Sequence, residues 1–305
     1  MKKIFLIVFS AFLICSCENN VITNKYEISL QSQDDLKSLL VDENYPLVSA
    51  HRGGSAEGFP ENAIETFERA TTFGPVIIET DIAMTKDSVL VLMHDDKLDR
   101  TTTGKGYVNN YLYSDIQEFH LKDYKNKTTS YKIPTLEEAL IWGKDKVIFT
   151  LDIKRGVPYE KVIDLVRKTN SEANSVLITY NANQARAIHK LDKELWLSVS
   201  ANTKQDIDRL KDYKVDITRI VAFVGTAEPS AQSIQYLRSV NVPIILGTLG
   251  NLDKRAKSIG DNLYKSFYQK GINILSADRN KEASIQAEAY AKEMGITSKY
   301  ISIKQ

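Results

Sequence analysis

Short apolar runs alternate with amphipathic stretches of helical period from about residue 45 to the C-terminus. The apolar runs predict strands over residues 46–50, 76–82, 89–93, 146–153, 175–179, 195–200, 219–224, 243–246 and 272–276. Apolar positions three and four apart predict helices over residues 62–71, 136–142, 159–168, 182–191, 204–213, 230–240, 262–270 and 281–294. Repeated strand–helix units are typical of a parallel sheet covered by helices.

The chain has about nine strand candidates over about 250 residues. This number favours a closed barrel over an open, doubly wound sheet, because a (β/α)8 barrel contains eight strand–helix units in about 250 residues. Only residues 83–88 separate two of the runs, which is too few for a helix, so we expect a tight turn or hairpin there. Residues 95–135 are polar and predict a long loop, and loops of that length are often functional. The expected fold is α/β, an irregular (β/α)8 TIM barrel over residues 46–305.

The N-terminus has the pattern of a targeting segment. Lys2 and Lys3 precede an apolar run of about 11 residues, which is too short for a bilayer about 30 Å thick and typical of a signal peptide. The following residues, Ile14-Cys15-Ser16-Cys17, resemble the lipobox of bacterial lipoproteins. This resemblance implies removal of residues 1–16 and a lipid on the Cys17 thiol. The alternative is ordinary signal cleavage nearby.

On the lipoprotein interpretation, residues 17–45 are the lipidated cysteine and a polar tether, with one helix around residues 33–40. The expected location is the bacterial cell envelope, anchored to a membrane and facing the periplasm or the cell surface. Both cysteines lie at the cleavage site, so the mature chain would have no intramolecular disulfide and no cysteine-based metal site.

The charge composition limits the classes of partner that the chain is expected to bind. The 305 residues include 40 Lys and Arg against 39 Asp and Glu, a net charge of +1. This balance gives no electrostatic reason to expect a nucleic-acid partner, and no protein partner is predicted. The expected partners are a small-molecule substrate and a membrane, reached through the lipid anchor.

Candidate chemistry gathers where strands end. The first strand leads into His51-Arg52-Gly53-Gly54, and a later one ends at His94. Glu79 and Asp81 are two apart on one strand, so both side chains point to the same face. Two buried carboxylates side by side repel each other, and a divalent cation with oxygen ligands resolves that conflict. The alternative is a strand that carries salt-bridged acids.

A further strand carries Asp152 and Lys154 on one face, where Asp152 could add a third oxygen ligand and Lys154 could neutralise an anionic substrate. An internal ion pair between the two is the alternative. Two imidazoles, a hard metal ion and two cations, Arg52 and Lys154, suit cleavage of a phosphodiester. One imidazole would take a proton from the nucleophile while the other protonates the leaving oxygen.

Several motifs follow one another in the order of a known family. They are His51-Arg52-Gly53, Pro60-Glu61-Asn62, Glu79-Thr80-Asp81, Thr85-Lys86-Asp87, His94-Asp95, Leu98-Asp99-Arg100-Thr101-Thr102 with Gly104, Ile133-Pro134-Thr135-Leu136-Glu137-Glu138 and Ala277-Asp278-Arg279. The chain resembles the glycerophosphodiester phosphodiesterases, which are phospholipase C-like phosphodiesterase barrels. The likeness covers residues 46–295 and is most specific in its N-terminal half.

The resemblance implies hydrolysis of glycerophosphodiesters to sn-glycerol 3-phosphate and an alcohol. It implies His51 and His94 as the general acid–base pair, and Glu79, Asp81 and Asp152 as ligands of one divalent ion, Ca²⁺ or Mg²⁺. Arg52 and Lys154 match phosphate-contacting positions. Glu61 belongs to the same motif and is expected near the site, supporting the metal ion or His51.

Three departures from the family pattern stand out. Asp152 replaces the usual Glu, Asn62-Ala63 replaces Asn-Thr, and residues 246–251 lack the aromatic residue that often lines the substrate pocket. The alternative functions are a related phosphodiesterase acting on phosphoinositides or sphingolipids, and a non-catalytic binding lipoprotein. His120 and His189 lie outside the motifs, and we expect them to be structural or solvated.

Overall fold

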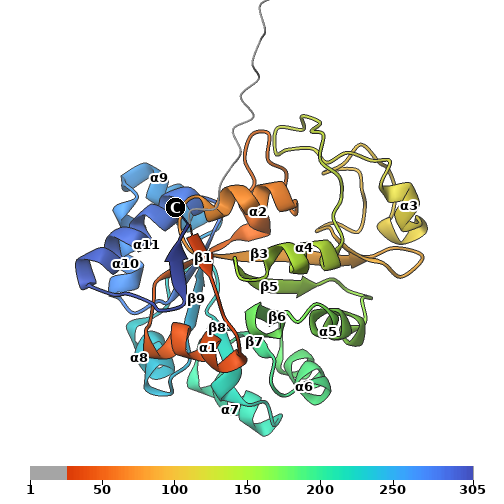
Figure 1. Ribbon diagram of the computed structural model, residues 1–305. Helices are drawn as coiled ribbons and strands as arrows, with labels where there is room; N and C mark the ends of the chain where they lie inside the picture. Colours follow the sequence, from red (N-terminus) through yellow and green to blue (C-terminus); the bar gives the residue numbers. More distant parts are fainter. Residues whose placement is uncertain (1–25, 305) are drawn as a thin grey trace, which may run out of the picture.

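The computed structural model describes residues 26–304 and contains a closed barrel of eight parallel strands (Figure 1). Round the barrel the strands are β2 (Leu47–Ala50), β10 (Ile274–Ala277), β9 (Ile244–Gly247), β8 (Ile220–Phe223), β7 (Trp196–Ser200), β6 (Ser175–Thr179), β5 (Ile148–Ile153) and β3 (Val76–Met84). Pairing of β3 with β2 closes the ring. The predicted (β/α)8 barrel is therefore confirmed.

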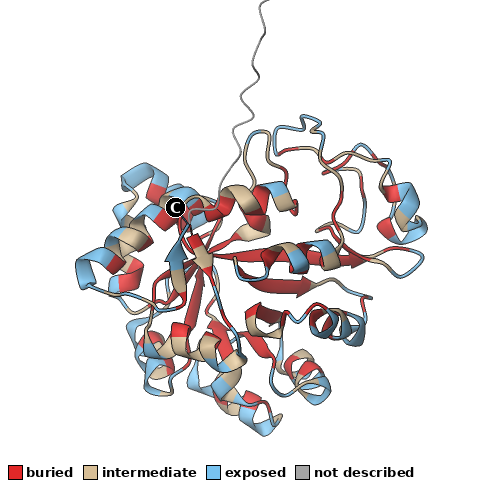
Figure 2. Ribbon diagram, viewed as in Figure 1, coloured by how far each residue is buried: buried red, intermediate tan, exposed pale blue. Residues whose placement is uncertain are grey.

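Helices surround the strands, with one face buried and the other exposed (Figure 2). They are α2 (Ile64–Thr71), α4 (Leu136–Gly143), α5 (Tyr159–Lys168), α6 (Ala182–Leu191), α7 (Lys204–Asp212), α8 (Ala231–Ser239), α9 (Asn251–Ile259), α10 (Asn262–Gln269) and α11 (Asn280–Met294). Several start at a capping side chain; Thr135 and Thr203, for example, each accept a hydrogen bond from the third residue of the helix that follows. Helix α9 is an element that the sequence pattern did not predict.

Side chains inside the barrel change character along each strand. A layer of large apolar residues fills the end where the strands begin: Leu47, Ile77, Ile148, Val176, Trp196, Val221, Ile245 and Ile274. Two positions further along the same strands, mostly polar residues line a cavity: Ser49, Glu79, Thr150, Ile178, Ser198, Phe223 and Ser276. Strand side chains alternate with period two, so residues two positions apart lie on the same inner face of the barrel. This face is packed with apolar side chains where the strands begin and lines the cavity where they end.

The barrel is irregular at β3, as expected. This strand continues past the barrel, and Ile82–Met84 pair antiparallel with β4 (Leu90–Leu92). The connecting turn is closed by a hydrogen bond from the Thr85 N–H to the Val89 carbonyl, 3.0 Å. The hairpin predicted for this segment is present.

The long segment after the hairpin is more ordered than a plain loop. It contains the short helices η3 (Val108–Asn110) and α3 (Tyr113–Ile116). Its buried side chains form a small core of their own with Met93 and Leu98. This insertion carries residues 95–135 over one side of the barrel (Figure 1).

Residues 26–45, assigned to a polar tether with one helix, are part of the folded body; the helix expected around residues 33–40 is present, but the description as a tether is wrong. Strand β1 (Tyr26–Ile28) pairs with β11 (Ile301–Ile303), and α1 (Gln33–Lys37) and η1 (Ser38–Asp42) follow. Leu36, Leu39 and Leu40 are buried against the apolar layer inside the barrel. With Ile28, Leu30 and Tyr45, these leucines cover the end of the barrel where the strands begin.

Within residues 26–304, no helix combines the length and the apolar character that crossing a membrane requires. The predicted signal peptide and Cys17 lie outside the described residues.

Candidate active site

A constrained turn places the first predicted residues at the end of β2. His51, Arg52 and Gly53 form the single turn η2, in which Arg52 has φ 51° and ψ 32°. Such a left-handed conformation is costly for a side chain other than glycine. Here it directs the Arg52 N–H onto Glu79 Oε2 at 2.7 Å. Gly53 has φ 83°, and a Cβ there would lie 2.3 Å from the Phe67 ring, so this position also requires glycine.

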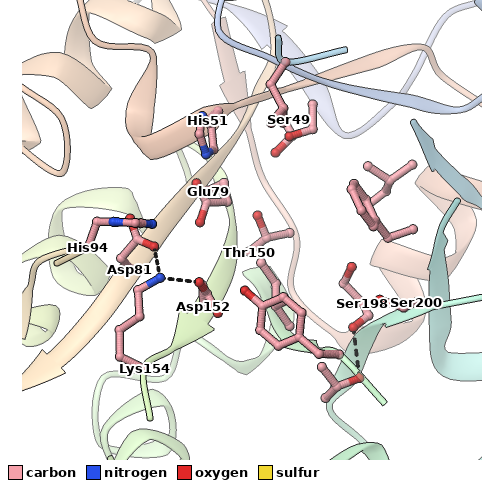
Figure 3. A pocket seen from close by; sticks show the side chains of 17 residues that line it. Ser49, His51, Glu79, Asp81, His94, Thr150, Asp152, Lys154, Ser198 and Ser200 are labelled. Atoms are coloured by element: carbon pink, nitrogen blue, oxygen red, sulfur yellow. Dashed lines mark hydrogen bonds and ion pairs between the residues drawn. The ribbon is translucent and has the colours of Figure 1, made fainter. Parts of the chain in front are cut away.

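Three carboxylates meet inside the barrel mouth (Figure 3). Glu79, Asp81 and Asp152 are all buried and each offers an oxygen within 4.8 Å of the others. Asp81 and Asp152 face each other across the β3–β5 pair. Burial and the neighbouring Asp81 carboxylate raise the pKa of Glu79 to about 8.

One cation already lies against this cluster. Lys154 Nζ is 2.6 Å from Asp81 Oδ1 and 2.6 Å from Asp152 Oδ2. Burial opposes ionisation of Asp81, but the Lys154 ammonium outweighs it and lowers the pKa of that carboxyl. Asp152 Oδ1 is buried and has no hydrogen-bond partner among the described residues. Three carboxylates with a spare buried oxygen fit a hard divalent ion.

Each predicted histidine is held by an aspartate. His51 Nδ1 lies 2.7 Å from Asp278 Oδ1, and His94 Nδ1 lies 2.7 Å from Asp95 Oδ1. Both rings line the cavity, and this arrangement leaves Nε2 of each for proton transfer. Burial lowers the pKa of His51, but its hydrogen bond to Asp278 and nearby negative charge raise it overall.

Asp278 and Asp95 lie in the motifs that carry the resemblance, but neither was predicted to have a role in the site. Asp278 directly follows β10, and Ala277 pairs with Ala50 just before His51. The hydrogen bond to His51 lowers the pKa of Asp278, which stays an acceptor for the ring. Sequence proximity could have suggested Asp95 as the partner of His94, but only closure of the barrel brings Asp278 to His51.

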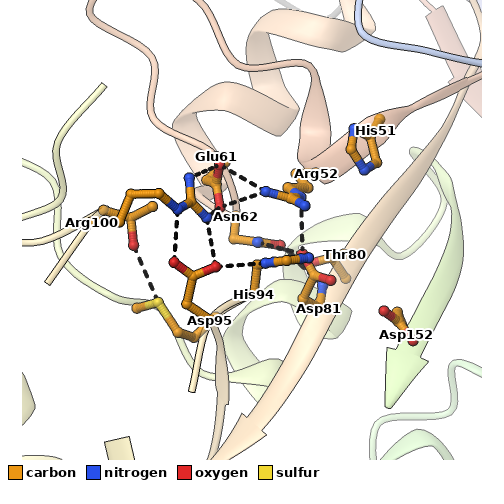
Figure 4. A network of polar contacts seen from close by, with 12 residues as sticks. His51, Arg52, Glu61, Asn62, Thr80, Asp81, His94, Asp95, Arg100 and Asp152 are labelled. Carbon is orange, nitrogen blue, oxygen red and sulfur yellow. Dashed lines mark hydrogen bonds and ion pairs between the residues drawn. The ribbon is translucent and has the colours of Figure 1, made fainter. Parts of the chain in front are cut away.

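Beside the cluster lies a network of charged groups (Figure 4). Glu61 contacts Arg52 Nη1 at 3.2 Å and accepts two hydrogen bonds from Arg100 at 2.8 and 2.9 Å. The partners of Glu61 are thus guanidinium groups and not His51 or the carboxylate cluster, which it was expected to support. Arg52 Nε is 3.7 Å from Asp81 Oδ2 and makes no hydrogen bond within the described residues.

Asn62 has a larger part than its sequence position suggested. It is buried, and its Nδ2 donates to Asp81 Oδ2 at 2.8 Å. Its Oδ1 accepts from the Asp81 N–H at 3.0 Å and from Thr80 Oγ1 at 2.7 Å. One amide therefore fixes both the backbone and the carboxylate of Asp81.

The cavity between these groups has a volume of about 240 Å³. All three carboxylates, both histidines and Lys154 line it, and its remaining wall is formed by hydroxyl and apolar side chains. The segment that lacks the family's aromatic residue contributes Leu249 to this wall. His120 and His189 do not line the cavity; His120 contacts Lys132 in the insertion, and His189 lies on α6.

Comparison with known proteins agrees with this geometry. The model of the glycerophosphoryl diester phosphodiesterase family matches residues 51–297. A glycerophosphodiester phosphodiesterase of Caldanaerobacter subterraneus subsp. tengcongensis is 35% identical over 157 residues, which are 49% of this chain and 64% of that protein. One of Bacillus subtilis is 38% identical over 178 residues, 52% of this chain and 60% of that protein. The matches thus span about three fifths of these relatives.

Solved structures extend the likeness to the whole fold. A glycerophosphoryl diester phosphodiesterase from Parabacteroides distasonis superposes with a TM-score of 0.82 at 31% identity, over 92% of this chain and 100% of that one. A phosphodiesterase of Oleispira antarctica, solved with its product sn-glycerol-3-phosphate, has the same fold, with a TM-score of 0.63 at 19% identity, over 80% of this chain and 97% of that one. The chain belongs to the glycerophosphoryl diester phosphodiesterase family.

Proposed function

We propose that this protein is a divalent-metal-dependent phosphodiesterase that hydrolyses glycerophosphodiesters to sn-glycerol 3-phosphate and an alcohol. The observation that carries the proposal is one cavity lined by the carboxylates of Glu79, Asp81 and Asp152 and by two imidazoles, His51 and His94. The family match supports the same activity. The two alternative functions have no observation in their favour.

In this mechanism Glu79, Asp81 and Asp152 would hold one Ca²⁺ or Mg²⁺ ion. A cation bound there would act as a Lewis acid toward a phosphate oxygen. Lys154 and Arg52, whose Nε lies 3.7 Å from Asp81 Oδ2, place positive charge beside the same carboxylates, where they can bind the anionic diester. Their charge would also stabilise the more negative transition state.

Proton transfer falls to the two imidazoles. One of His51 and His94 accepts the proton of the nucleophile, and the other gives a proton to the departing alcohol oxygen. Asp278 accepts a hydrogen bond from Nδ1 of His51, and Asp95 accepts one from Nδ1 of His94. These bonds orient both rings and leave each Nε2 for proton transfer in the cavity. A carboxylate partner also stabilises the imidazolium that forms when the ring takes up a proton.

A substrate panel tests this function. The purified protein is treated with EDTA and then given Ca²⁺ or Mg²⁺, together with glycerophosphocholine, glycerophosphoethanolamine or glycerophosphoinositol. We expect release of glycerol 3-phosphate that stops on chelation and returns with one of the ions. The His51→Ala/His94→Ala double variant, prepared in the same way, controls for contaminating enzymes.

Two results would contradict the proposal. Cleavage of phosphatidylinositol or sphingomyelin, with glycerophosphodiesters left intact, would favour the related phosphodiesterase. Binding of glycerophosphodiesters without release of glycerol 3-phosphate under any ion would favour a non-catalytic lipoprotein.

We also propose that Cys17 carries a lipid and anchors the protein to a membrane of the bacterial envelope. The support is the lipobox-like Ile14-Cys15-Ser16-Cys17 after an apolar run.

A further inference from the structure

Arg100 makes more side-chain hydrogen bonds to carboxylates than any other residue around the site, yet it does not line the cavity. Its Nε and Nη2 donate to the two oxygens of Asp95 at 2.7 and 2.9 Å. Its Nη1 and Nη2 donate to the two oxygens of Glu61 at 2.9 and 2.8 Å. One guanidinium therefore makes a bidentate contact with each of two carboxylates (Figure 4).

Each of these carboxylates leads to a different part of the site. Asp95 Oδ1 also contacts His94 Nδ1 at 2.7 Å. Glu61 also contacts Arg52 Nη1 through both of its oxygens, at 3.2 Å each. A planar guanidinium fixes the plane of each carboxylate that it contacts through two hydrogen bonds. Arg100 therefore restricts the orientation of His94 through Asp95 and of Arg52 through Glu61.

The charges of these groups also indicate that Arg100 holds both carboxylates in place. The hydrogen bonds from Arg100 hold the pKa of Asp95 well below its usual range, so Asp95 remains an acceptor for the His94 ring. Two guanidinium groups and two carboxylates alternate along the chain Asp95–Arg100–Glu61–Arg52. Without Arg100, the carboxylates of Asp95 and Glu61 would face each other with no cation between them.

We propose that Arg100 is a positioning residue that couples the two halves of the active site. Through Asp95 it aims His94 for proton transfer, and through Glu61 it holds Arg52 against the phosphate position beside Asp81. This assignment rests on the proposed function. It gives a role to Arg100 in the Leu98-Asp99-Arg100-Thr101-Thr102 motif.

Arg100→Lys is the informative substitution, because lysine keeps the positive charge but lacks the planar group that makes a bidentate contact with each of two carboxylates. We expect kcat for glycerophosphodiester hydrolysis to fall about tenfold to a hundredfold, the scale of a misplaced catalytic group. We also expect the inhibition constant of inorganic phosphate to rise about tenfold, as if one charge-assisted hydrogen bond were lost. A lower kcat together with weaker phosphate inhibition in Arg100→Lys would indicate that Arg100 acts on both halves of the site.

Single substitutions at Asp95 and Glu61 separate the effect on His94 from the effect on Arg52. Asp95→Asn should lower kcat and leave phosphate inhibition near normal, whereas Glu61→Gln should weaken phosphate inhibition more than it lowers kcat. The Arg100→Lys/Asp95→Asn double variant should have a kcat close to that of Asp95→Asn alone, because Arg100 acts on His94 through Asp95.

Lys105→Ala is the matched control. Lys105 lies in the same insertion and its ammonium is exposed, 4.0 Å from Asp99, so the variant removes a nearby cation without touching the network. Its kcat and phosphate inhibition should equal those of the unmodified protein.

A spectroscopic measurement makes the test independent of activity. The Nδ1 proton of His94, hydrogen-bonded to Asp95, should give a downfield resonance that is assigned by its loss in His94→Ala. We expect this resonance to persist in Lys105→Ala and to shift or vanish in Arg100→Lys.

Three results would overturn the proposal. They are an unchanged resonance in Arg100→Lys, a loss of kcat with normal phosphate inhibition, and changes that Lys105→Ala reproduces. If the unmodified protein released no glycerol 3-phosphate, the proposed function would fail, and the resonance in Arg100→Lys would still decide whether Arg100 positions His94.

Discussion

The family resemblance implies a glutamate where this chain has Asp152, and the two carboxylate oxygens of Asp152 have different surroundings. One of its oxygens pairs with Lys154 at 2.6 Å, while the other is buried and makes no hydrogen bond to any of the described residues. The carboxylate therefore reaches the cluster of Glu79 and Asp81 and also an ammonium group. This division of its two oxygens is consistent with a ligand that binds a metal ion through one oxygen.

Replacing Asp152 tests it as a ligand. Asp152→Asn should weaken divalent-ion affinity about tenfold or more, because a carboxylate ligand to a hard cation is lost, and excess ion should restore part of the activity. Asp152→Glu should be tolerated, since it restores the residue usual in the family. Isothermal titration with Ca²⁺ and Mg²⁺ measures both variants; unchanged affinity in Asp152→Asn would remove this residue from the ligand set.

Lys154 would compete with a divalent ion for the carboxylates of Asp81 and Asp152. Lys154→Met should bind the divalent ion about tenfold more tightly or better, because repulsion between +1 and +2 charges about 4 Å apart is about 2 kcal/mol even in water. Activity should nevertheless fall, since the phosphate loses a cation. Titration of the ion at pH 8 alongside kcat measures this split; weaker ion binding would contradict it.

The two histidines should respond as an acid–base pair. His51→Ala and His94→Ala should each lower kcat by about 10²–10⁴-fold. The double variant should be little worse than either single variant, because the two groups act in one reaction. His189→Ala and His120→Ala are the controls, and steady-state kinetics on glycerophosphocholine should show near-normal rates for both. Equal losses at all four positions would indicate damage to the fold.

At the scale of elements, the segment before the first barrel strand is a structural part of the body. Leu36 is fully buried with Leu39 and Leu40 below the barrel interior. The Trp196 Nε1–H donates to the Gln33 carbonyl at 3.1 Å, which ties α1 to β7. Tyr26 and Tyr45 both donate to Glu288 on α11, at 3.0 and 2.9 Å.

A core substitution in this segment tests its contribution to stability. Leu36→Ala should lower the free energy of unfolding by about 2–5 kcal/mol, the usual range for a buried leucine. Leu191→Ala, at an exposed leucine, should change it by only about 0.5 kcal/mol. Urea unfolding followed by circular dichroism compares them. A cost for Leu36→Ala as small as that for Leu191→Ala would mean that this segment does not stabilise the barrel.

For the whole molecule, the two ends of the barrel have different tasks. The end where the strands begin is closed by apolar side chains and by α1 and η1, while the cavity opens at the other end. A lipid on Cys17 would be attached nine positions before Tyr26 in the sequence. Anchoring and catalysis should be separable.

Substitution at the lipobox tests this separation. Cys17→Ser should move the protein from the membrane fraction to the soluble fraction and leave kcat on glycerophosphocholine unchanged, because residues 26–304 form the folded body. Cys15→Ser, which keeps a small residue before the cleavage site, should remain in membranes. Fractionation after a high-salt wash measures both; a Cys17→Ser protein that stayed in membranes would refute the lipid anchor.

Much of the architecture was determined by local pattern. The alternation of apolar runs and helical periods predicted the barrel, and the short spacing after Ile82 predicted the hairpin of β3 with β4. Period-two spacing placed Glu79 with Asp81, and Asp152 with Lys154, on common faces. These features depend on residues near one another in the chain, so the sequence alone was sufficient to predict them.

Only the tertiary structure decided which faces meet. His51 and Asp278 are 227 positions apart, and the β2–β10 pair brings them together when the ring closes. Arg100 reaches Glu61 only because the insertion packs beside the barrel mouth. The pattern of residues 26–45 predicts a polar tether with one helix, and only the tertiary structure shows that Leu36 on that helix packs against the barrel. Periodicity reports which face of an element is buried, but the partner of that face depends on how the whole chain closes.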